Sequence, residues 1–233
     1  MSSSVPVPAA PSVLAPHRPV DNPVVSARSL TKVYGRGSGA VKALDAVNVD
    51  IARARFTAIM GPSGSGKSTL MHCLAGLDSV TSGEIMLDGD MVSSMSQRRL
   101  TRLRRERIGF IFQSFNLVPT LSASENITLP LDIARKKVNR QRFDQVVDAV
   151  GLKDRLSHRP AELSGGQVQR VACARALVGE PAVVFADEPT GNLDSHSTEQ
   201  VLEILRRSVN DLGQSVVMVT HEPEAAAWAD TVI

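Results

Sequence analysis

The sequence contains few cysteines. Only two of its 233 residues are cysteine, Cys73 and Cys173, and they lie far apart and outside any CxxC pattern. Each falls on an expected helix face among apolar residues, which is typical of a small buried side chain. We therefore expect neither a disulfide nor a cysteine-based metal site, and a reducing cytoplasm fits this usage.

Long apolar runs are also missing. No stretch approaches the roughly 18 apolar residues that a transmembrane helix needs. The first residues lack the basic start and the uninterrupted apolar core of a secretory signal. Repeated prolines predict instead that residues 1–23, which are rich in Pro, Ser and Ala, form a disordered tail. We expect contact with a membrane only through a partner protein.

An excess of charge of one sign is absent too. The formal net charge is +2, which gives no reason to expect a nucleic-acid partner. The segment from Ser96 to Arg107 is an expected helix that carries six arginines. Nucleic acid or anionic lipid would suit such a helix, but no aromatic residue is interleaved and Glu106 interrupts the run. A solvated face, with Leu100 and Leu103 pointing inward, is the favoured interpretation.

The rest of the composition, 42% hydrophobic and 21% charged, is ordinary for a soluble globular protein. The length allows one α/β domain with a sizeable core and a smaller subdomain. Strand-like runs alternate with helix-like runs, and the wholly apolar run from Val183 to Ala186 predicts a central parallel strand. Further strands are expected over 24–34, 41–51, 56–60, 84–87, 108–112 and 215–220.

This alternation is interrupted between residues 122 and 156, where the pattern becomes helical. Ser122 and Glu125 form a capping-box pattern at its start. Pro130 and Gly151 are expected to separate helices within the block. We therefore expect an inserted helical subdomain at about residues 114–165, within an ordered domain of residues 24–233.

A glycine-rich loop lies between the strand-like run 56–60 and the helix-like run 70–77. It matches G-x-x-x-x-G-K-[ST] in its required context of strand, loop and helix. Its glycines allow backbone N–H groups to approach phosphate oxygens, and the helix N-terminus adds a positive dipole end. Lys67 is a mobile charge for the β- and γ-phosphates, and Ser68 offers a hydroxyl to Mg²⁺. The loop comprises Gly61, Pro62, Ser63, Gly64, Ser65, Gly66, Lys67, Ser68 and Thr69.

Two further motifs narrow the chemistry. Asp187 and Glu188 follow the buried strand, where a carboxylate beside a P-loop holds Mg²⁺ and a second one activates the attacking water. The other motif opens an expected helix, whose bare N-terminus suits an anion. Its residues are Leu163, Ser164, Gly165, Gly166 and Gln167.

With these motifs in place, the chain resembles the nucleotide-binding subunit of an ABC transporter from about Val24 to Ile233. The resemblance implies a P-loop NTPase (RecA-like) core with a mainly parallel sheet, an antiparallel β subdomain and the inserted helical subdomain. By this resemblance, the Walker A loop is Gly61 to Thr69, the signature motif is Leu163 to Gln167, and the D-loop is Asn192 to Asp194. The Walker B aspartate is Asp187, the catalytic glutamate is Glu188, and the Q-loop glutamine, near Mg²⁺ or water, is Gln113. The switch histidine that senses the γ-phosphate is His221, and the residue that stacks on adenine is Tyr34.

The resemblance is strongest to the branch of macrolide-export, lipoprotein-release and cell-division ATPases. It implies a Mg²⁺-dependent ATP hydrolase that works as a homodimer, with each ATP held between Walker A of one copy and the signature motif of the other. It also implies an integral-membrane permease as partner, efflux or mechanical transmission as the role, and the cytoplasmic face of the plasma membrane as the location.

The sequence departs from the family in two places. Val168 stands where a polar residue is common, and the chain stops at Ile233, where family members usually continue through a final hairpin. A truncated sequence and a naturally short chain both fit the second departure, and loss of the hairpin would weaken the sheet near His221.

One rival function remains open, a non-transporting ABC ATPase that regulates a cell-wall hydrolase through a division-type membrane protein. A DNA-repair ATPase would need long coiled-coil arms, a translation-type relative would need two cassettes, and a GTPase would need an Asn-Lys-x-Asp motif. None of these features appears in the sequence.

Overall fold

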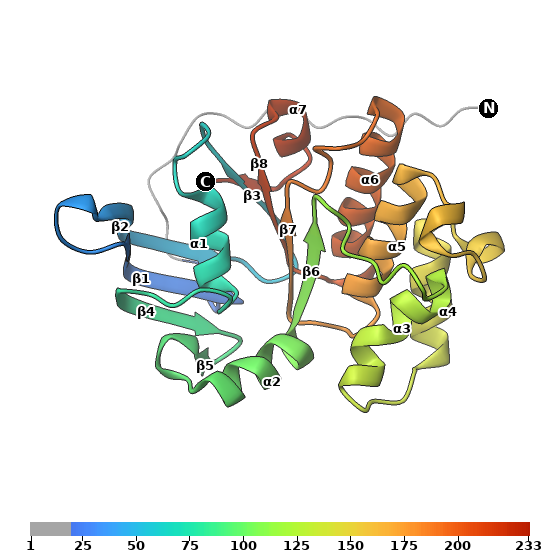
Figure 1. Cartoon of the computed structure of the whole chain (residues 1–233), viewed down its shortest axis with the longest axis horizontal. Coiled ribbons are helices and arrows are strands. Elements are labelled where there is room, and N and C mark those ends of the chain that lie inside the picture. Colours follow the sequence, from blue (N-terminus) through green and yellow to red (C-terminus); the bar gives the residue numbers. More distant parts are fainter. Residues whose placement is uncertain (1–19) are drawn as a thin grey trace.

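The computed structural model describes residues 20–233, so the expected tail lies almost wholly outside the described residues. Two sheets and their helices make up the fold (Figure 1). The strands are β1 Val25–Tyr34, β2 Val41–Ile51, β3 Phe56–Met60, β4 Ser82–Leu87, β5 Asp90–Met91, β6 Ile108–Phe112, β7 Val183–Asp187, β8 Val216–Thr220 and β9 Thr231–Val232. The helices are α1 Lys67–Leu74, α2 Gln97–Arg107, α3 Ala123–Ile133, α4 Arg140–Val150, α5 Gly165–Leu177, α6 Ser195–Leu212 and α7 Pro223–Ala226.

The central sheet is parallel, in the order β6-β7-β8-β3-β9. Its middle strands are buried on both faces because apolar side chains alternate between two cores. Val184 and Ala186 of β7 join the core with α3 to α6, whereas Val183 and Phe185 join the core with α1 and the smaller sheet. This burial on both faces explains why β7 reads as a wholly apolar run.

The smaller sheet is antiparallel, in the order β2-β1-β4-β5. It packs with α1 on one side of the parallel sheet, and α3 to α6 lie on the other side (Figure 1). The expected combination of a mainly parallel core and an antiparallel β part is therefore confirmed.

Helices α3 and α4 occupy the segment in which the helical block was expected. The capping box of Ser122 and Glu125 is present at the start of α3, and Gly151 ends α4 in a left-handed conformation. Pro130 was expected to separate helices, and this prediction is wrong, because Pro130 lies inside α3. The helix continues past it, with the Ala134 N–H donating to the Pro130 carbonyl at 3.0 Å, since proline lacks a donor but keeps its acceptor.

Asn126 of α3 fixes the loop that precedes this helix. Its side chain is fully buried, and its Oδ1 accepts from the Val118 N–H at 2.8 Å. Its Nδ2 donates to the carbonyls of Val118, Leu121 and Ser122. One amide therefore satisfies several backbone groups of the loop between residues 118 and 122.

Replacing Asn126 with leucine is expected to lower the free energy of unfolding by about 3 kcal/mol, because buried backbone groups lose their partners. Urea unfolding followed by the fluorescence of Trp228, the only tryptophan, measures this. The exposed helix cap Asn139, which accepts only from the Arg142 N–H, provides the comparison. Its replacement by alanine is expected to cost about 1 kcal/mol, and equal losses for the two variants would contradict the assignment to Asn126.

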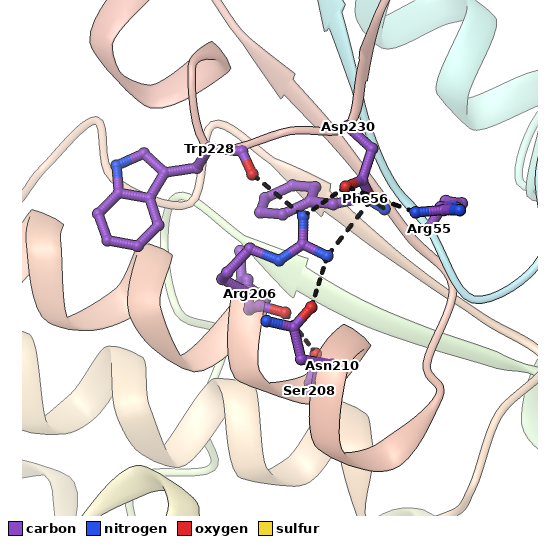
Figure 2. Close-up of polar contacts among 8 residues, drawn as sticks. Arg55, Phe56, Arg206, Ser208, Asn210, Trp228 and Asp230 are labelled. Atoms are coloured by element: carbon purple, nitrogen blue, oxygen red, sulfur yellow. Dashed lines mark hydrogen bonds and ion pairs between the residues drawn. The ribbon is translucent and has the colours of Figure 1, made fainter. Parts of the chain in front are cut away.

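A polar cluster ties the segment that leads into β9 to β3 and α6 (Figure 2). Asp230 accepts from the Phe56 N–H at 2.8 Å and from Arg206 Nη1 at 2.9 Å. The Arg206 guanidinium also donates to the Trp228 carbonyl and to Asn210 Oδ1, and it lies 5.9 Å from the centre of the Phe56 ring. The cluster therefore holds β9 beside β3.

Candidate ATP site

The loop between β3 and α1 carries the first part of the site. Gly66 adopts φ +93°, and a Cβ there would lie 2.5 Å from the Ala43 carbonyl oxygen, so only glycine fits. Lys67 begins α1, and its Nζ donates to the carbonyls of Gly61 and Pro62, each at 2.8 Å. The ammonium group is thus held over the loop whose N–H groups are expected to face phosphate.

Asp187, the last residue of β7, lies against the start of α1. Ser68 Oγ donates to Asp187 Oδ1 at 3.2 Å, and His72 Nε2 lies 3.5 Å from Asp187 Oδ2. Asp187, which accepts a hydrogen bond from the His72 ring, raises the pKa of His72. Sequence reasoning missed His72, although it follows Ser68 by one helical turn and therefore shares its face of α1.

Glu188 follows immediately and adopts a left-handed backbone conformation, φ +45°, which is uncommon for a residue with a side chain. Its N–H donates to the Val219 carbonyl at 3.0 Å, so the turn is tied to β8. His221, just beyond the end of β8, has its Nδ1 3.2 Å from Glu188 Oε1. Adjacent parallel strands thus bring together two side chains that are 33 residues apart.

Gln113 follows β6 and faces the same cleft, which has a volume of about 410 Å³. Gln113 Nε2 donates to Asn192 Oδ1 at 3.4 Å, and Asn192 Nδ2 donates to the Gln113 carbonyl at 3.2 Å. The segments around Gln113 and Asn192, expected as the Q-loop and the D-loop, are therefore joined within one chain. The cleft is lined by Ser68, Phe112, Gln113, Ser114, Asn116, Asp187 and Glu188. Phe112, Ser114 and Asn116 were not expected there, although they adjoin Gln113 in the sequence.

Residues 163–167, expected as the signature motif, lead into α5 and form its start. The Ser164 hydroxyl accepts from the Gln167 N–H at 3.3 Å, and Gln167 Oε1 accepts from the Ser164 N–H at 2.9 Å. Asp194 caps α6, because its carboxylate accepts from both the N–H and the hydroxyl of Ser197. Ser197 in turn packs against Gly166. The residues expected in the signature motif and in the D-loop therefore lie together, but none of them lines the cleft that contains Asp187 and Glu188.

The contact between Gly166 and Ser197 leaves no room for a side chain. A Cβ on Gly166 would meet Ser197 Oγ and lie 2.9 Å from Ser197 Cβ, closer than real Cβ atoms approach. Gly166→Ala is expected to lower stability by about 1–3 kcal/mol, measured as the thermal midpoint. Ser197→Gly should restore much of that loss, and Gly165→Ala, which meets nothing within 4 Å, is the matched control. An equal loss for both alanine variants would contradict the steric explanation.

Tyr34 ends β1 and is 43% exposed. Its hydroxyl donates to Asp78 Oδ2 at 2.6 Å, which raises the pKa of Tyr34. Lys32 Nζ lies 4.7 Å from the centre of the same ring and donates to Asp78 Oδ1. The ring is thus held in place at its hydroxyl end while a large part of it remains open for a planar ligand.

The sequence and the fold are both similar to those of known proteins. The family model described as "ABC transporter" matches residues 44–191. An uncharacterized ABC transporter ATP-binding protein of Methanocaldococcus jannaschii, MJ1508, is 48% identical and covers 90% of this chain and 94% of its own length. The lipoprotein-releasing system ATP-binding protein LolD of Bordetella pertussis is 45% identical, with coverage of 89% and 91%.

The macrolide export ATP-binding/permease protein MacB of Bdellovibrio bacteriovorus is also 45% identical, but this chain covers only 32% of it. Among solved structures, the ATP-binding cassette MJ0796 bound to ADP and Pi, a dimer in a post-hydrolysis state, has a TM-score of 0.80 and 40% identity. That match covers 90% of this chain and 93% of the cassette. The chain belongs to the ABC transporter family, in the branch that contains the macrolide-export and lipoprotein-release ATP-binding proteins.

Proposed function

We propose that this chain is an ATP-hydrolysing subunit that drives a separate membrane permease by mechanical transmission, in an export or release process. The observation that carries the proposal is that the glycine-rich loop and the two carboxylates lie in contact. Ser68 at the end of the loop donates to Asp187, and Glu188, which follows Asp187, contacts His221. This arrangement supplies a phosphate cradle, oxygen donors for a cation and a base for water within one cleft.

The proposed roles follow from these positions. The loop amides and Lys67 hold the phosphates, with Tyr34 stacking on adenine. Glu188 orients and deprotonates the attacking water, and His221, in contact with Glu188, lies where it can sense the γ-phosphate. Gln113 contacts both the cleft and Asn192, so it can report occupancy of the site to its neighbours.

The residues of the cleft also fit Mg²⁺. Hydroxyl, carboxylate and amide oxygens are available from Ser68, Asp187 and Gln113, and Mg²⁺ is typically bound by one or two carboxylates together with substrate phosphates. No group of three or more His, Cys, Asp or Glu side chains suited to a metal occurs in residues 20–233, which agrees with a cation held largely by the nucleotide. When bound, Mg²⁺ neutralises charge on the phosphates.

A second copy completes the proposed site. Ser164, Gly165, Gly166 and Gln167 lie at the start of α5, outside the cleft of their own chain. Their capped helix N-terminus remains available for the phosphates of an ATP held by another copy. Asp194, joined to Gly166 through Ser197, belongs to the same face.

A second cavity, of about 420 Å³, gives the permease a docking place. It lies between α2, β6 and α3, and it is lined mainly by apolar side chains, among them Phe110, Leu129 and Ile133. Phe112 and Asn116 line both this groove and the nucleotide cleft, so a helix of a permease bound here would touch the same segment as the ATP. We propose a helical subdomain at about residues 114–165, which contains α3 and α4.

No helix within residues 20–233 is long and apolar enough to cross a bilayer. The proposed location, peripheral at the cytoplasmic face of the plasma membrane, therefore depends on the permease.

The proposed cation site is tested by titrating Mg²⁺ in an ATPase assay. EDTA is expected to abolish turnover. Ser68→Ala and Asp187→Asn should each raise the Mg²⁺ concentration for half-maximal rate by roughly tenfold or more, since each removes or weakens an oxygen donor. Asp132→Asn, an exposed change on α3, should leave the titration unchanged. Turnover that persists in EDTA, or identical curves for all variants, would contradict the site.

A further inference from the structure

Positive charge is concentrated in one part of the chain. Residues 97–140 contain ten lysines and arginines and three acidic residues, whereas the whole chain has a formal net charge of only +2. Six of the basic residues are the arginines of α2, and the other four lie at positions 135–140, where α3 joins α4. The sequence alone shows these as two separate clusters about 30 residues apart.

The fold brings the two clusters to the same edge of the molecule. Arg105 Nη1 of α2 donates to the carbonyl of Ile133, at the end of α3, at 3.5 Å. Both residues line the apolar groove between α2 and α3. Figure 1 shows α2 and the loop after α3 at the lower edge of the view, away from the loop that precedes α1. We call the exposed basic residues of these two segments the basic rim.

Five side chains of the basic rim have no carboxylate partner in the part of the chain that the structure describes. Basic side chains elsewhere on the surface commonly have one, as in the pairs Lys42–Asp45, Arg53–Asp88, Lys153–Asp148 and Arg207–Asp211. The unpartnered side chains of the rim are exposed, and they are Arg98, Arg99, Arg135, Lys136 and Lys137. Gathered unpaired cations favour an anionic partner from outside the chain.

Apolar side chains are exposed within and beside the basic rim. Ile133 is 58% exposed, Val138 is 39% exposed, and Leu77, which lines the same groove, is 42% exposed. Cations that surround exposed aliphatic side chains are typical of a protein surface that meets lipid headgroups, because the cations meet phosphates while the aliphatic groups enter the interface. A nucleic-acid surface would benefit from aromatic side chains, and neither α2 nor the loop after α3 contains one.

We propose that the basic rim binds the anionic phospholipid surface of the membrane beside the permease. This proposal rests on the proposed function, because a permease docked in the groove would bring this edge of the molecule to the bilayer. It adds a direct lipid contact to the protein contact. It also revises the interpretation of α2 as a merely solvated face, because the fold places a second basic segment beside this helix.

The test is co-sedimentation of the full chain with vesicles in the absence of any permease. The chain is expected to bind vesicles of mixed phosphatidylglycerol and phosphatidylcholine at least about tenfold better than pure phosphatidylcholine, and to be released by raised salt. The fourfold variant Arg98→Glu, Arg99→Glu, Lys136→Glu and Lys137→Glu should lose this preference. A control with the same change of charge elsewhere should keep it: Lys42→Glu, Lys153→Glu, Arg155→Glu and Arg207→Glu.

A second measurement separates lipid from nucleic acid. Val138→Asn should weaken binding to anionic vesicles while leaving any binding to a DNA duplex unchanged, because only the bilayer receives the aliphatic side chain. Equal binding to both kinds of vesicle, an equal loss in the control, or stronger binding to the duplex than to anionic vesicles would overturn the proposal. ATPase activity of all variants without lipid should match that of the unmodified chain, so the proposed function is tested separately.

Discussion

Replacing Glu188 with glutamine is expected to slow ATP hydrolysis by roughly 10²–10⁴-fold, the usual contribution of a general base. Glutamine keeps the size of the side chain and a contact with His221, but it cannot accept a proton from water. ATP binding should persist, since the loop, Lys67 and Ser68 are untouched. The variant should therefore accumulate as an ATP-bound dimer, and size-exclusion chromatography with and without ATP measures this together with the turnover rate.

The matched control is Glu199→Gln, an exposed carboxylate on α6. It should hydrolyse ATP like the unmodified chain and form no stable dimer. Unchanged turnover in Glu188→Gln would contradict the assignment of Glu188 as the general base. Loss of ATP binding would show that the change disturbs the nucleotide site instead of the chemical step.

Mixing two inactive variants is expected to restore activity if the site is shared between copies. Lys67→Ala removes the phosphate-binding cation, and Ser164→Arg blocks the signature helix. In a mixed dimer, one site combines both changes, but the other pairs an intact loop with an intact signature. An equimolar mixture should recover about a quarter of the unmodified rate, since about half of the dimers are mixed and each has one intact site.

Steady-state ATPase rates of the separate and mixed proteins measure this recovery. The control is the double variant Lys67→Ala/Ser164→Arg. It should stay inactive when mixed with either single variant, because no such dimer pairs an intact loop with an intact signature. A mixture no more active than the sum of its parts would argue against a shared site. Independent support comes from the concentration dependence, because the rate should rise more than linearly with protein while the chain is mostly monomeric.

Strands and the loop were predictable because their signals are local. The run of apolar residues in β7 and the glycines before Lys67 have the same meaning in any fold, and the structure places both as expected. Pro130 was misread because helix-breaking is also a local rule, and it fails where a helix tolerates one missing donor. Here the surrounding core, with Ile127 and Leu131 buried beside the proline, holds α3 together.

Contacts between distant segments could not be predicted. His72 near Asp187, Asn192 bonded to Gln113, and Ser197 packed on Gly166 each join elements whose relative placement is set only by the complete sheet. The same limit applies to the basic rim, because its two charged segments are distant in the sequence and become neighbours only through the contact between α2 and the end of α3. Charge along a sequence says little until the fold determines which charges are neighbours.

The order of the parallel sheet has a consequence for synthesis on the ribosome. Strand β3, which leads into the phosphate loop, is flanked by β8 and β9, and both of these strands come much later in the chain. A nascent chain that ends before Val216 therefore presents β3 without either neighbour, and the cluster of Arg206, Asp230 and Phe56 cannot yet form. The nucleotide cradle is thus expected to fold only after β8 and β9 have emerged from the ribosome, and until then its leading strand is an unpaired edge that a chaperone would shield.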